Sequence, residues 1–131
     1  MSLNHENLLK AFSTCLSDDK VYLILQYMNQ GSLVNILSYK YTTGLKDISL
    51  IATILLSIAR AIEYLHSNDI IHRDIKASNV LVDSSGLVCL GDFGIIGLKR
   101  CFSFEGSLAW MAPEIFEPKK EGYGNKVLEV L

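Results

Sequence analysis

A short loop in the middle of the sequence carries side chains suited to handling phosphate groups. Residues 71–79 read Ile-His-Arg-Asp-Ile-Lys-Ala-Ser-Asn and place Asp74, Lys76 and Asn79 close together. Phosphoryl transfer needs a carboxylate to orient the attacking hydroxyl, cations to neutralise phosphate charge and oxygen ligands for magnesium. Asp74 can supply the first of these, Lys76 the second, and the amide oxygen of Asn79 part of the third.

A second loop, residues 91–94, reads Gly-Asp-Phe-Gly and offers Asp92 as a further ligand. Magnesium prefers hard oxygen ligands and binds through few protein groups, so Asp92 and Asn79 together would form such a set. Each loop alone also has an ordinary interpretation. Asp-Phe-Gly usually forms a turn, and an Arg-Asp pair such as Arg73-Asp74 is usually a surface ion pair.

The segments before the first loop are predicted to form one strand and two helices. Residues 21–28 are rich in β-branched and aromatic types, which predicts a buried strand. Ser32 is expected to cap a short helix that runs through Tyr39, because its hydroxyl can accept an unpaired backbone N–H. A longer helix is expected over about 47–67, capped by Asp47. Its apolar positions recur every three or four residues and form one core-facing stripe, which consists of Ile48, Ile51, Ile54, Leu55, Ile58, Ile62 and Leu65.

A hairpin is predicted between the two loops. Residues 80–82 and 87–90 are short apolar runs, and the Asp-Ser-Ser-Gly sequence between them at 83–86 is typical of a turn. The order of elements is therefore strand, helix, long helix, loop, hairpin, loop. This arrangement predicts an α+β chain in which the two chemically equipped loops flank one hairpin.

The bulk composition restricts the class of protein. The chain has 131 residues, half of them apolar, and a formal net charge of −2. These values indicate one globular domain at most and give no reason to expect nucleic acid or a membrane as a partner. The first residues lack a signal peptide, and the three cysteines are widely spaced. We therefore expect reduced thiols and a cytoplasmic protein.

Taken in order, these motifs resemble those of the eukaryotic serine/threonine protein kinases. His-Arg-Asp-x-Lys-x-x-Asn, Asp-Phe-Gly and then Trp-Met-Ala-Pro-Glu at 110–114 follow one another at kinase-like spacing. The resemblance implies a partial protein-kinase-like α+β fold, with residues 1–28 ending the small lobe and hinge. Residues 29–131 would form the large lobe through the activation segment. It also implies ATP and Mg²⁺ as cofactors and a protein Ser/Thr hydroxyl as substrate.

The same resemblance assigns residues around the nucleotide. Leu25 would be the gatekeeper, the Gln26 carbonyl and the Met28 amide would face the adenine, and Leu81 would form the apolar floor beneath it. Plain core packing is the alternative explanation for Leu25 and Leu81. Asp92, at the start of Asp-Phe-Gly, would hold the metal that bridges the phosphates.

Several residues point to a particular branch of the kinases. Lys76, directly after Asp-Ile, matches the serine/threonine pattern rather than the tyrosine pattern. The segment 106–114 and the Gly-Ser-Leu at 31–33 resemble the sterile-twenty-like group. The stretch 51–55 and the Ser-Phe-x-Gly-Ser run at 103–107 are similar to those of the SPAK-like, germinal-centre-kinase branch.

The resemblance also implies a regulatory segment. In the family pattern, a phosphorylated Ser103 would dock against Arg73 of the catalytic loop, since a guanidinium can hold a phosphate bidentately. An upstream activating kinase or a scaffold is then a further expected partner. Ser107 is the competing phosphorylation site, but its family role is to hydrogen-bond Asp74 and Lys76. The activation segment is short, and Glu105 stands where a small apolar residue is usual, so Ser103 as an unmodified loop serine is the alternative.

Some kinase motifs do not occur in the sequence. It contains no Gly-x-Gly-x-x-Gly loop and no Val-Ala-Ile-Lys strand, and Leu-Glu-Val-Leu at 128–131 replaces the expected aspartate and tryptophan. We therefore expect a kinase domain truncated at both ends and inactive in isolation. A kinase-derived binding module without catalysis and a truncated splice or gene-model remnant are the alternatives. An unrelated globular domain is a third.

Overall fold

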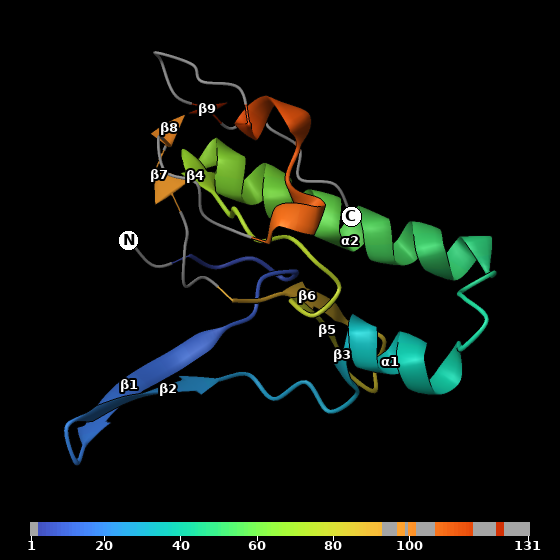
Figure 1. Ribbon diagram of the computed structural model, residues 1–131. Coiled ribbons are helices and arrows are strands. Elements are labelled where there is room, and N and C mark those ends of the chain that lie inside the picture. Colours follow the sequence, from blue (N-terminus) through green and yellow to red (C-terminus); the bar gives the residue numbers. More distant parts are fainter. Residues whose placement is uncertain (1–2, 93–96, 99, 102–106, 117–122, 125–131) are drawn as a thin grey trace.

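The computed structural model describes residues 3–92, 97–98, 100–101, 107–116 and 123–124 (Figure 1). A two-stranded hairpin stands at one end, and a long helix with short strands and a second, shorter helix forms the remainder. The α-helices are α1 (Leu33–Lys40) and α2 (Ile48–Ser67). The strands are β1 (Ala11–Ser17), β2 (Lys20–Leu25), β3 (Gly31–Ser32), β4 (Ile70–Ile71), β5 (Val80–Val82), β6 (Val88–Leu90), β7 (Gly97–Leu98), β8 (Arg100–Cys101) and β9 (Tyr123–Gly124).

The long helix α2 begins where the sequence predicts. The Oδ1 atom of Asp47 accepts the backbone N–H groups of Ser49 and Leu50 at 2.9 and 3.1 Å, which caps the first turn. The apolar stripe is only partly covered, because Ile48 and Leu55 are exposed. The buried residues of α2 are Ile54, Ile58, Ala61 and Leu65.

These buried positions of α2 face β4 and β6, so the helix packs as a core helix. By length and composition alone α2 would also suffice to cross a bilayer. Its charged residues Arg60 and Glu63 interrupt the apolar sequence.

The short helix α1 is also capped as predicted. The Ser32 hydroxyl accepts the N–H of Asn35 at 3.4 Å, and the helix ends at Lys40, one residue beyond the predicted end. The Val34 N–H donates to the Ala77 carbonyl at 3.1 Å, which ties the start of α1 to the loop at 71–79. None of the α1 side chains is fully buried.

The predicted hairpin is present as β5 and β6. Asp83 organises the turn, since its Oδ1 accepts the N–H groups of Ser85 and Leu87 at 2.8 and 3.0 Å. Gly86 has a φ of 89°, a left-handed conformation that glycine adopts without steric cost. The structure adds β3 on the outer side of β5, giving the order β3-β5-β6. The sequence did not predict this third strand.

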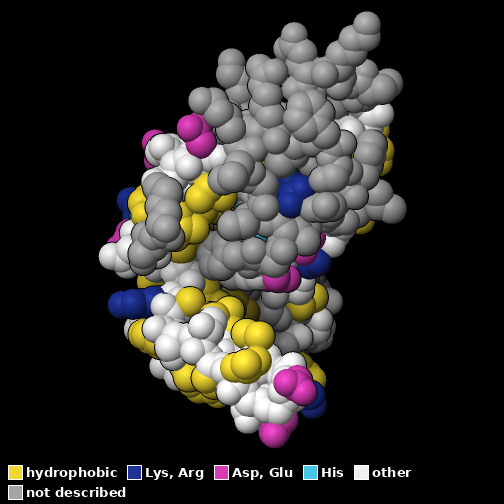
Figure 2. All heavy atoms as spheres, turned by 90° about the vertical axis from the view of Figure 1, so that its left-hand side faces the viewer, with side chains coloured by type: hydrophobic (Ala, Val, Ile, Leu, Met, Phe, Trp, Pro, Cys, Tyr) yellow, Lys and Arg dark blue, Asp and Glu magenta, His cyan; other side chains and the backbone are white. Residues whose placement is uncertain are grey.

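The prediction of a buried strand at 21–28 is wrong in its burial and in its end. The strand β2 stops at Leu25 and pairs with β1 alone, and both strands are exposed throughout. Val21, for example, is 74% exposed. Figure 2 shows yellow hydrophobic side chains on the lower part of the face where the hairpin turns toward the viewer. The apolar types on both faces of β2 predict burial, but within the described residues only β1 pairs with it.

The N-terminal loop joins β6 to α2. Leu8 forms a parallel bridge with Leu90, and the Asn7 side-chain amide donates to the Val88 carbonyl at 2.9 Å. The His5 ring stacks on Tyr64 of α2 with 5.0 Å between ring centroids. The main core gathers around this junction and contains Leu8, Ile54, Ile58, Ala61, Leu65, Ile70, Ile75, Val80, Val88 and Leu90.

The burial pattern of α2 yields a stability prediction. Replacing Ile58, which is 1% exposed, by alanine removes packed methylene groups and leaves a cavity. We expect the free energy of unfolding to fall by about 2–5 kcal/mol, measured by urea denaturation followed by circular dichroism. Leu56→Ala on the same helix is the control, because Leu56 is 53% exposed and should cost at most about 0.5 kcal/mol. Equal losses in the two variants would contradict this packing.

Candidate active site

The loop at 71–79 is fixed at both ends by buried residues. It starts in β4 with Ile71 and ends in β5 with Val80, and Ile75 anchors its middle in the core. Arg73 has a φ of 72°, a left-handed conformation rare for a residue with a Cβ. Such backbone geometry is costly and persists where the surroundings enforce it, which is characteristic of functional loops.

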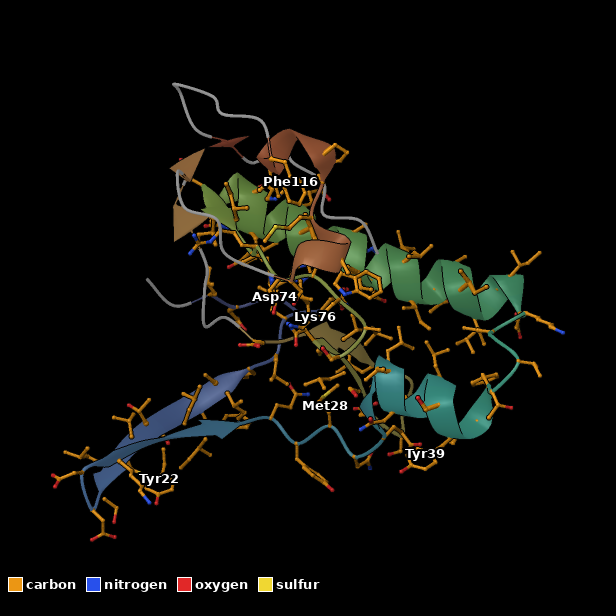
Figure 3. All side chains as sticks on the ribbon, viewed as in Figure 1. Tyr22, Met28, Tyr39, Asp74, Lys76 and Phe116 are labelled. Carbon is orange, nitrogen blue, oxygen red and sulfur yellow. The ribbon has the colours of Figure 1, made fainter. Side chains whose placement is uncertain are left out.

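The structure brings the three predicted chemical residues of this loop into direct contact, and Figure 3 shows Asp74 and Lys76 beside each other. The Lys76 ammonium lies 2.6 Å from Oδ2 of Asp74. The Asn79 side-chain amide donates to the same Oδ2 at 3.0 Å and to the Asp74 backbone carbonyl at 2.8 Å. Asp74 is therefore a buried carboxylate held by one cation and one amide.

Ser107 reaches this group from far along the sequence. Its backbone N–H donates to Oδ1 of Asp74 at 3.1 Å, and its hydroxyl accepts from the Lys76 ammonium at 2.8 Å. The three residues close a ring of polar contacts. The hydrogen bonds to Asp74 and Lys76 that the resemblance implied for Ser107 are therefore present.

The charge of Asp74 follows from these contacts. Burial by itself raises the pKa of the carboxyl, but hydrogen bonds from Lys76, Ser107 and Asn79 outweigh it and leave the pKa below its usual value. Asp74 is thus ionised at neutral pH. It can accept a hydrogen bond from an incoming hydroxyl, which would share the carboxylate oxygens with Lys76, Asn79 and Ser107.

His72 is a residue whose role the sequence analysis missed. Its ring is 2% exposed, and Nε2 donates to the Gly91 carbonyl at 2.9 Å. Its Nδ1 accepts the Asp74 backbone N–H at 3.3 Å. One imidazole therefore joins the two loops, with the proton on Nε2. Burial lowers the pKa of His72, which keeps the ring neutral. The position of the histidine directly before Arg-Asp was the available signal.

Asp92 is placed beside the first loop through its neighbour Gly91. The Gly91 N–H donates to the Asn79 carbonyl at 2.8 Å, so the backbones of the two predicted metal ligands are linked. Asp92 is exposed and has a φ of 60°, again in the left-handed region. A Cβ on Gly91 would lie 3.2 Å from Cδ2 of Leu9, so a larger residue would press on this packing.

The donor set at this point fits a magnesium ion. The Asn79 amide nitrogen is directed to Asp74, so the opposite side of the amide presents Oδ1. The Ser78 hydroxyl makes a long contact of 3.4 Å with this oxygen. Asp92 contributes an exposed carboxylate. An amide oxygen and a carboxylate are hard ligands of the kind that magnesium prefers.

The predicted nucleotide residues divide into two groups. Met28 is buried in a small cluster with Leu9 and Cys89, and Leu81 packs against that cluster. Leu25 lies outside it at the end of β2 and is 40% exposed, while the Gln26 N–H donates to the Lys10 carbonyl at 2.8 Å. The structure thus brings Met28 and Leu81 together but leaves Leu25 separate.

Of the predicted regulatory pair, Arg73 and Ser103, the structure describes Arg73 alone. Arg73 lies in the catalytic loop next to Asp74, as described above. Ser103 falls outside the described residues, as do Phe93 and Gly94 of the Asp-Phe-Gly motif.

The buried neutral His72 makes a pH prediction. In the unfolded chain His72 titrates near its ordinary pKa of about 6.5, whereas its pKa in the folded chain is lower. The unfolded state therefore binds more protons between the two values, and the stability should fall as the pH drops below about 6.5. We expect the free energy of unfolding, from urea titrations at pH 7.5 and 5.5, to depend less on pH in His72→Gln.

His66 provides the control for that experiment. Burial also lowers the pKa of His66, so His66→Gln measures its separate share of the same pH dependence. A pH dependence that His72→Gln leaves unchanged would contradict the buried neutral ring.

Comparison with known proteins agrees with this geometry. The family model of the protein kinase domain matches residues 1–128. Serine/threonine-protein kinase fray1 of Dictyostelium discoideum is 36% identical over 130 residues, which cover 95% of this chain and 22% of that protein. Mitogen-activated protein kinase kinase kinase 1a of Physcomitrium patens is 40% identical over 91% of this chain and 16% of its own length.

A third relative is germinal center kinase 3 of Caenorhabditis elegans. It is 32% identical over 142 residues, which cover 94% of this chain and 24% of that protein. The chain therefore spans about a quarter or less of the length of these three relatives. The family model, by contrast, matches nearly the whole chain. The chain therefore belongs to the protein kinase domain family.

Proposed function

We propose that this chain is part of a serine/threonine protein kinase that transfers the γ-phosphoryl group of ATP to a protein hydroxyl. The observation that carries the proposal is the ring of contacts among Asp74, Lys76 and Ser107. It places an ionised carboxylate and a cation 2.6 Å apart at the end of the activation segment. The relatives named serine/threonine kinases support the same activity.

The chemistry that these residues would perform is positioning and charge neutralisation. Asp74 would accept a hydrogen bond from the substrate hydroxyl and direct its oxygen at the γ-phosphorus. As the oxygen–phosphorus bond forms and the bond to ADP breaks, the hydroxyl proton leaves toward Asp74. Lys76 would offset the negative charge of the transferring group. The products are ADP and a phosphorylated protein.

Asn79 and Asp92 would hold Mg²⁺, which when bound neutralises and orients the phosphates of ATP. The hydrogen bond between the Gly91 N–H and the Asn79 carbonyl supports this assignment, because it couples the positions of both ligands. Leu81, which packs against the cluster of Leu9, Met28 and Cys89, would form the apolar floor beneath the adenine, and the backbone amide of Met28 would face the adenine.

We further propose membership of the sterile-twenty-like group, in a germinal-centre-kinase branch. The similarity to a germinal center kinase and to fray1 supports it. Mitogen-activated protein kinase kinase kinase 1a is 40% identical, more than either of these two, so the motifs at 31–33 and 103–107 carry the distinction. We propose the cytoplasm as the compartment, since Cys15 and Cys89 are free thiols.

A non-catalytic binding module is the second candidate. The exposed apolar hairpin of β1 and β2 favours contact with another protein surface. Calorimetric titration with Mg²⁺-ATP separates the two functions, because a binding module needs no affinity for the nucleotide.

The first activity prediction concerns Asp74. We expect Asp74→Asn to lower the rate of protein phosphorylation by at least about a hundredfold while leaving the affinity for Mg²⁺-ATP within about threefold. The measurement is transfer of labelled phosphate from ATP to a serine-rich protein. It is made on a chimera in which residues 1–128 replace the matching segment of fray1, because the isolated chain is expected to be inactive.

Asp92→Asn is the complementary variant. It should weaken Mg²⁺-dependent ATP binding, whereas Asp83→Asn, which alters only the carboxylate of the β5–β6 turn, should leave binding unchanged. Unchanged turnover in Asp74→Asn would show that the catalytic assignment is wrong. Equal binding losses in the Asp92 and Asp83 variants would remove the metal assignment.

The regulatory proposal concerns Ser103 and Arg73. If phosphorylated Ser103 docks on Arg73, Ser103→Ala and Arg73→Ala should each reduce the activity of the chimera. The activity of the double variant should be no lower than that of the less active single variant. Activity is measured after treatment with an upstream kinase and again after a phosphatase. Losses that simply add would exclude the contact.

A further inference from the structure

The side chain of Asn29, on the segment between β2 and β3, contacts the turn between β5 and β6. Its Oδ1 accepts the Ser84 backbone N–H at 2.7 Å, and its Nδ2 donates to the Ser84 hydroxyl at 2.9 Å. Both polar atoms of one amide therefore bind one residue 55 positions along the chain. We call this pair of hydrogen bonds the Asn29–Ser84 clasp. It lies outside the ring of contacts around Asp74.

The β5–β6 turn is held by its own hydrogen bonds and can serve as the fixed side of the clasp. Oδ1 of Asp83 accepts the Ser85 N–H at 2.8 Å, and the Gly86 N–H donates to the Asp83 carbonyl at 3.1 Å. The second of these bonds closes a four-residue turn, with Ser84 at its second position. Neither bond involves Asn29, so the turn has its own support and the clasp positions the segment between β2 and β3 against it.

The segment between β2 and β3 is attached to the rest of the chain by backbone bonds at its two ends. The Gln26 N–H donates to the Lys10 carbonyl at 2.8 Å, and the Gln30 N–H donates to the Val82 carbonyl at 3.1 Å. Between these ends, the side chain of Asn29 reaches the β5–β6 turn. Because both ends already lie against other strands, forming the clasp requires little further ordering of the backbone.

Met28, directly before Asn29 on this segment, has a backbone N–H that is open to a ligand (Figure 3). The residue is 7% exposed, and its side chain packs with Leu9 and Cys89. Within the part of the chain that the structure describes, its N–H makes no hydrogen bond, whereas its carbonyl accepts the Gly31 N–H at 3.0 Å. Backbone N–H groups of buried residues usually have a partner. The Met28 N–H is therefore available to an acceptor such as a ring nitrogen.

We propose that Asn29 is a positioning residue for adenine binding. The clasp fixes the Met28 N–H, which would bond to the adenine, relative to Leu81, which would lie beneath the ring. Leu81 and Ser84 belong to the same β5–β6 hairpin, so the anchor of the clasp and the apolar floor form one unit. This role of Asn29 rests on the proposed kinase function, because it requires a bound adenine nucleotide.

Four variants change the clasp in graded steps. Asn29→Leu removes both hydrogen bonds. Asn29→Asp keeps both, because a carboxylate can accept the Ser84 N–H and also a proton from the Ser84 hydroxyl. Ser84→Ala removes one bond, and Ser84→Pro removes both while suiting the second position of the turn. Ser85→Ala is the control, because it alters a hydroxyl of the same turn that bonds to Asp83.

Nucleotide affinity is measured on the fray1 chimera, as ADP binding by calorimetry and as KM and kcat with ATP. We expect Asn29→Leu and Ser84→Pro each to weaken ADP binding and raise KM about fivefold, with kcat within about twofold of the unaltered chimera. Ser84→Ala should cost about twofold, and Asn29→Asp and Ser85→Ala should have almost no effect. Combining Asn29→Leu with Ser84→Pro should cost no more than either change alone, because both remove the same contact.

Amide hydrogen exchange on the full 131-residue chain tests the contact itself. Asn29→Leu should speed exchange of the Ser84 N–H, whereas the Gly86 N–H, which bonds within the turn, should keep its protection. This comparison separates loss of the clasp from loss of the hairpin.

Several results would overturn the role of Asn29. ADP affinity that Asn29→Leu leaves unchanged, with the Ser84 N–H deprotected, would make the clasp a purely structural contact. A fall in kcat as large as the rise in KM would indicate general damage to the domain, and an Asn29→Asp variant as weak as Asn29→Leu would exclude hydrogen bonding as the cause.

The unaltered chimera separates this proposal from the proposed function. ADP binding without protein phosphorylation would contradict the kinase activity, and the ADP measurements would still decide the role of Asn29. Absence of ADP binding would overturn both.

Discussion

The buried imidazole of His72 is the interaction on which the rest of the site depends. It accepts the Asp74 N–H with one nitrogen and donates to the Gly91 carbonyl with the other, at 3.3 and 2.9 Å. Both nitrogens are used only when the ring is neutral and Nε2 carries the proton. The His72 side chain therefore fixes the position of Asp74, which would orient a hydroxyl, relative to the loop that would hold magnesium.

Near the His72 imidazole, two residues with left-handed backbone conformations are each supported by a neighbouring contact. Arg73 and Asp92 both adopt left-handed φ angles, and each directly adjoins a residue bound to His72. The Asn79 carbonyl adds a second link, because it accepts the Gly91 N–H. Strain of this kind persists when surrounding bonds over-determine it, which is what a preorganised phosphoryl-transfer site requires.

Local signals in the sequence predicted much of this arrangement. Asp47 and Ser32 cap the helices they were expected to cap, and the Asp-Ser-Ser-Gly turn forms the expected hairpin, because these choices depend on neighbouring residues. The contact of His72 with Gly91 and the strand β3 were not predictable in the same way, since they join residues distant in sequence. The burial of β2 was mispredicted because apolar residue types indicate that a strand tends to be buried. They do not identify the residues that would cover it.

The central claim is that His72 is neutral, protonated on Nε2 and bonded to both loops. Long-range ¹H–¹⁵N NMR of the histidine side chains tests it directly, since the two ring nitrogens have distinct shifts in each tautomer. The account predicts the Nε2–H tautomer for neutral His72 and a titration midpoint below the ordinary value of about 6.5. A titration midpoint near the ordinary value of about 6.5, with both tautomers populated, would contradict the account.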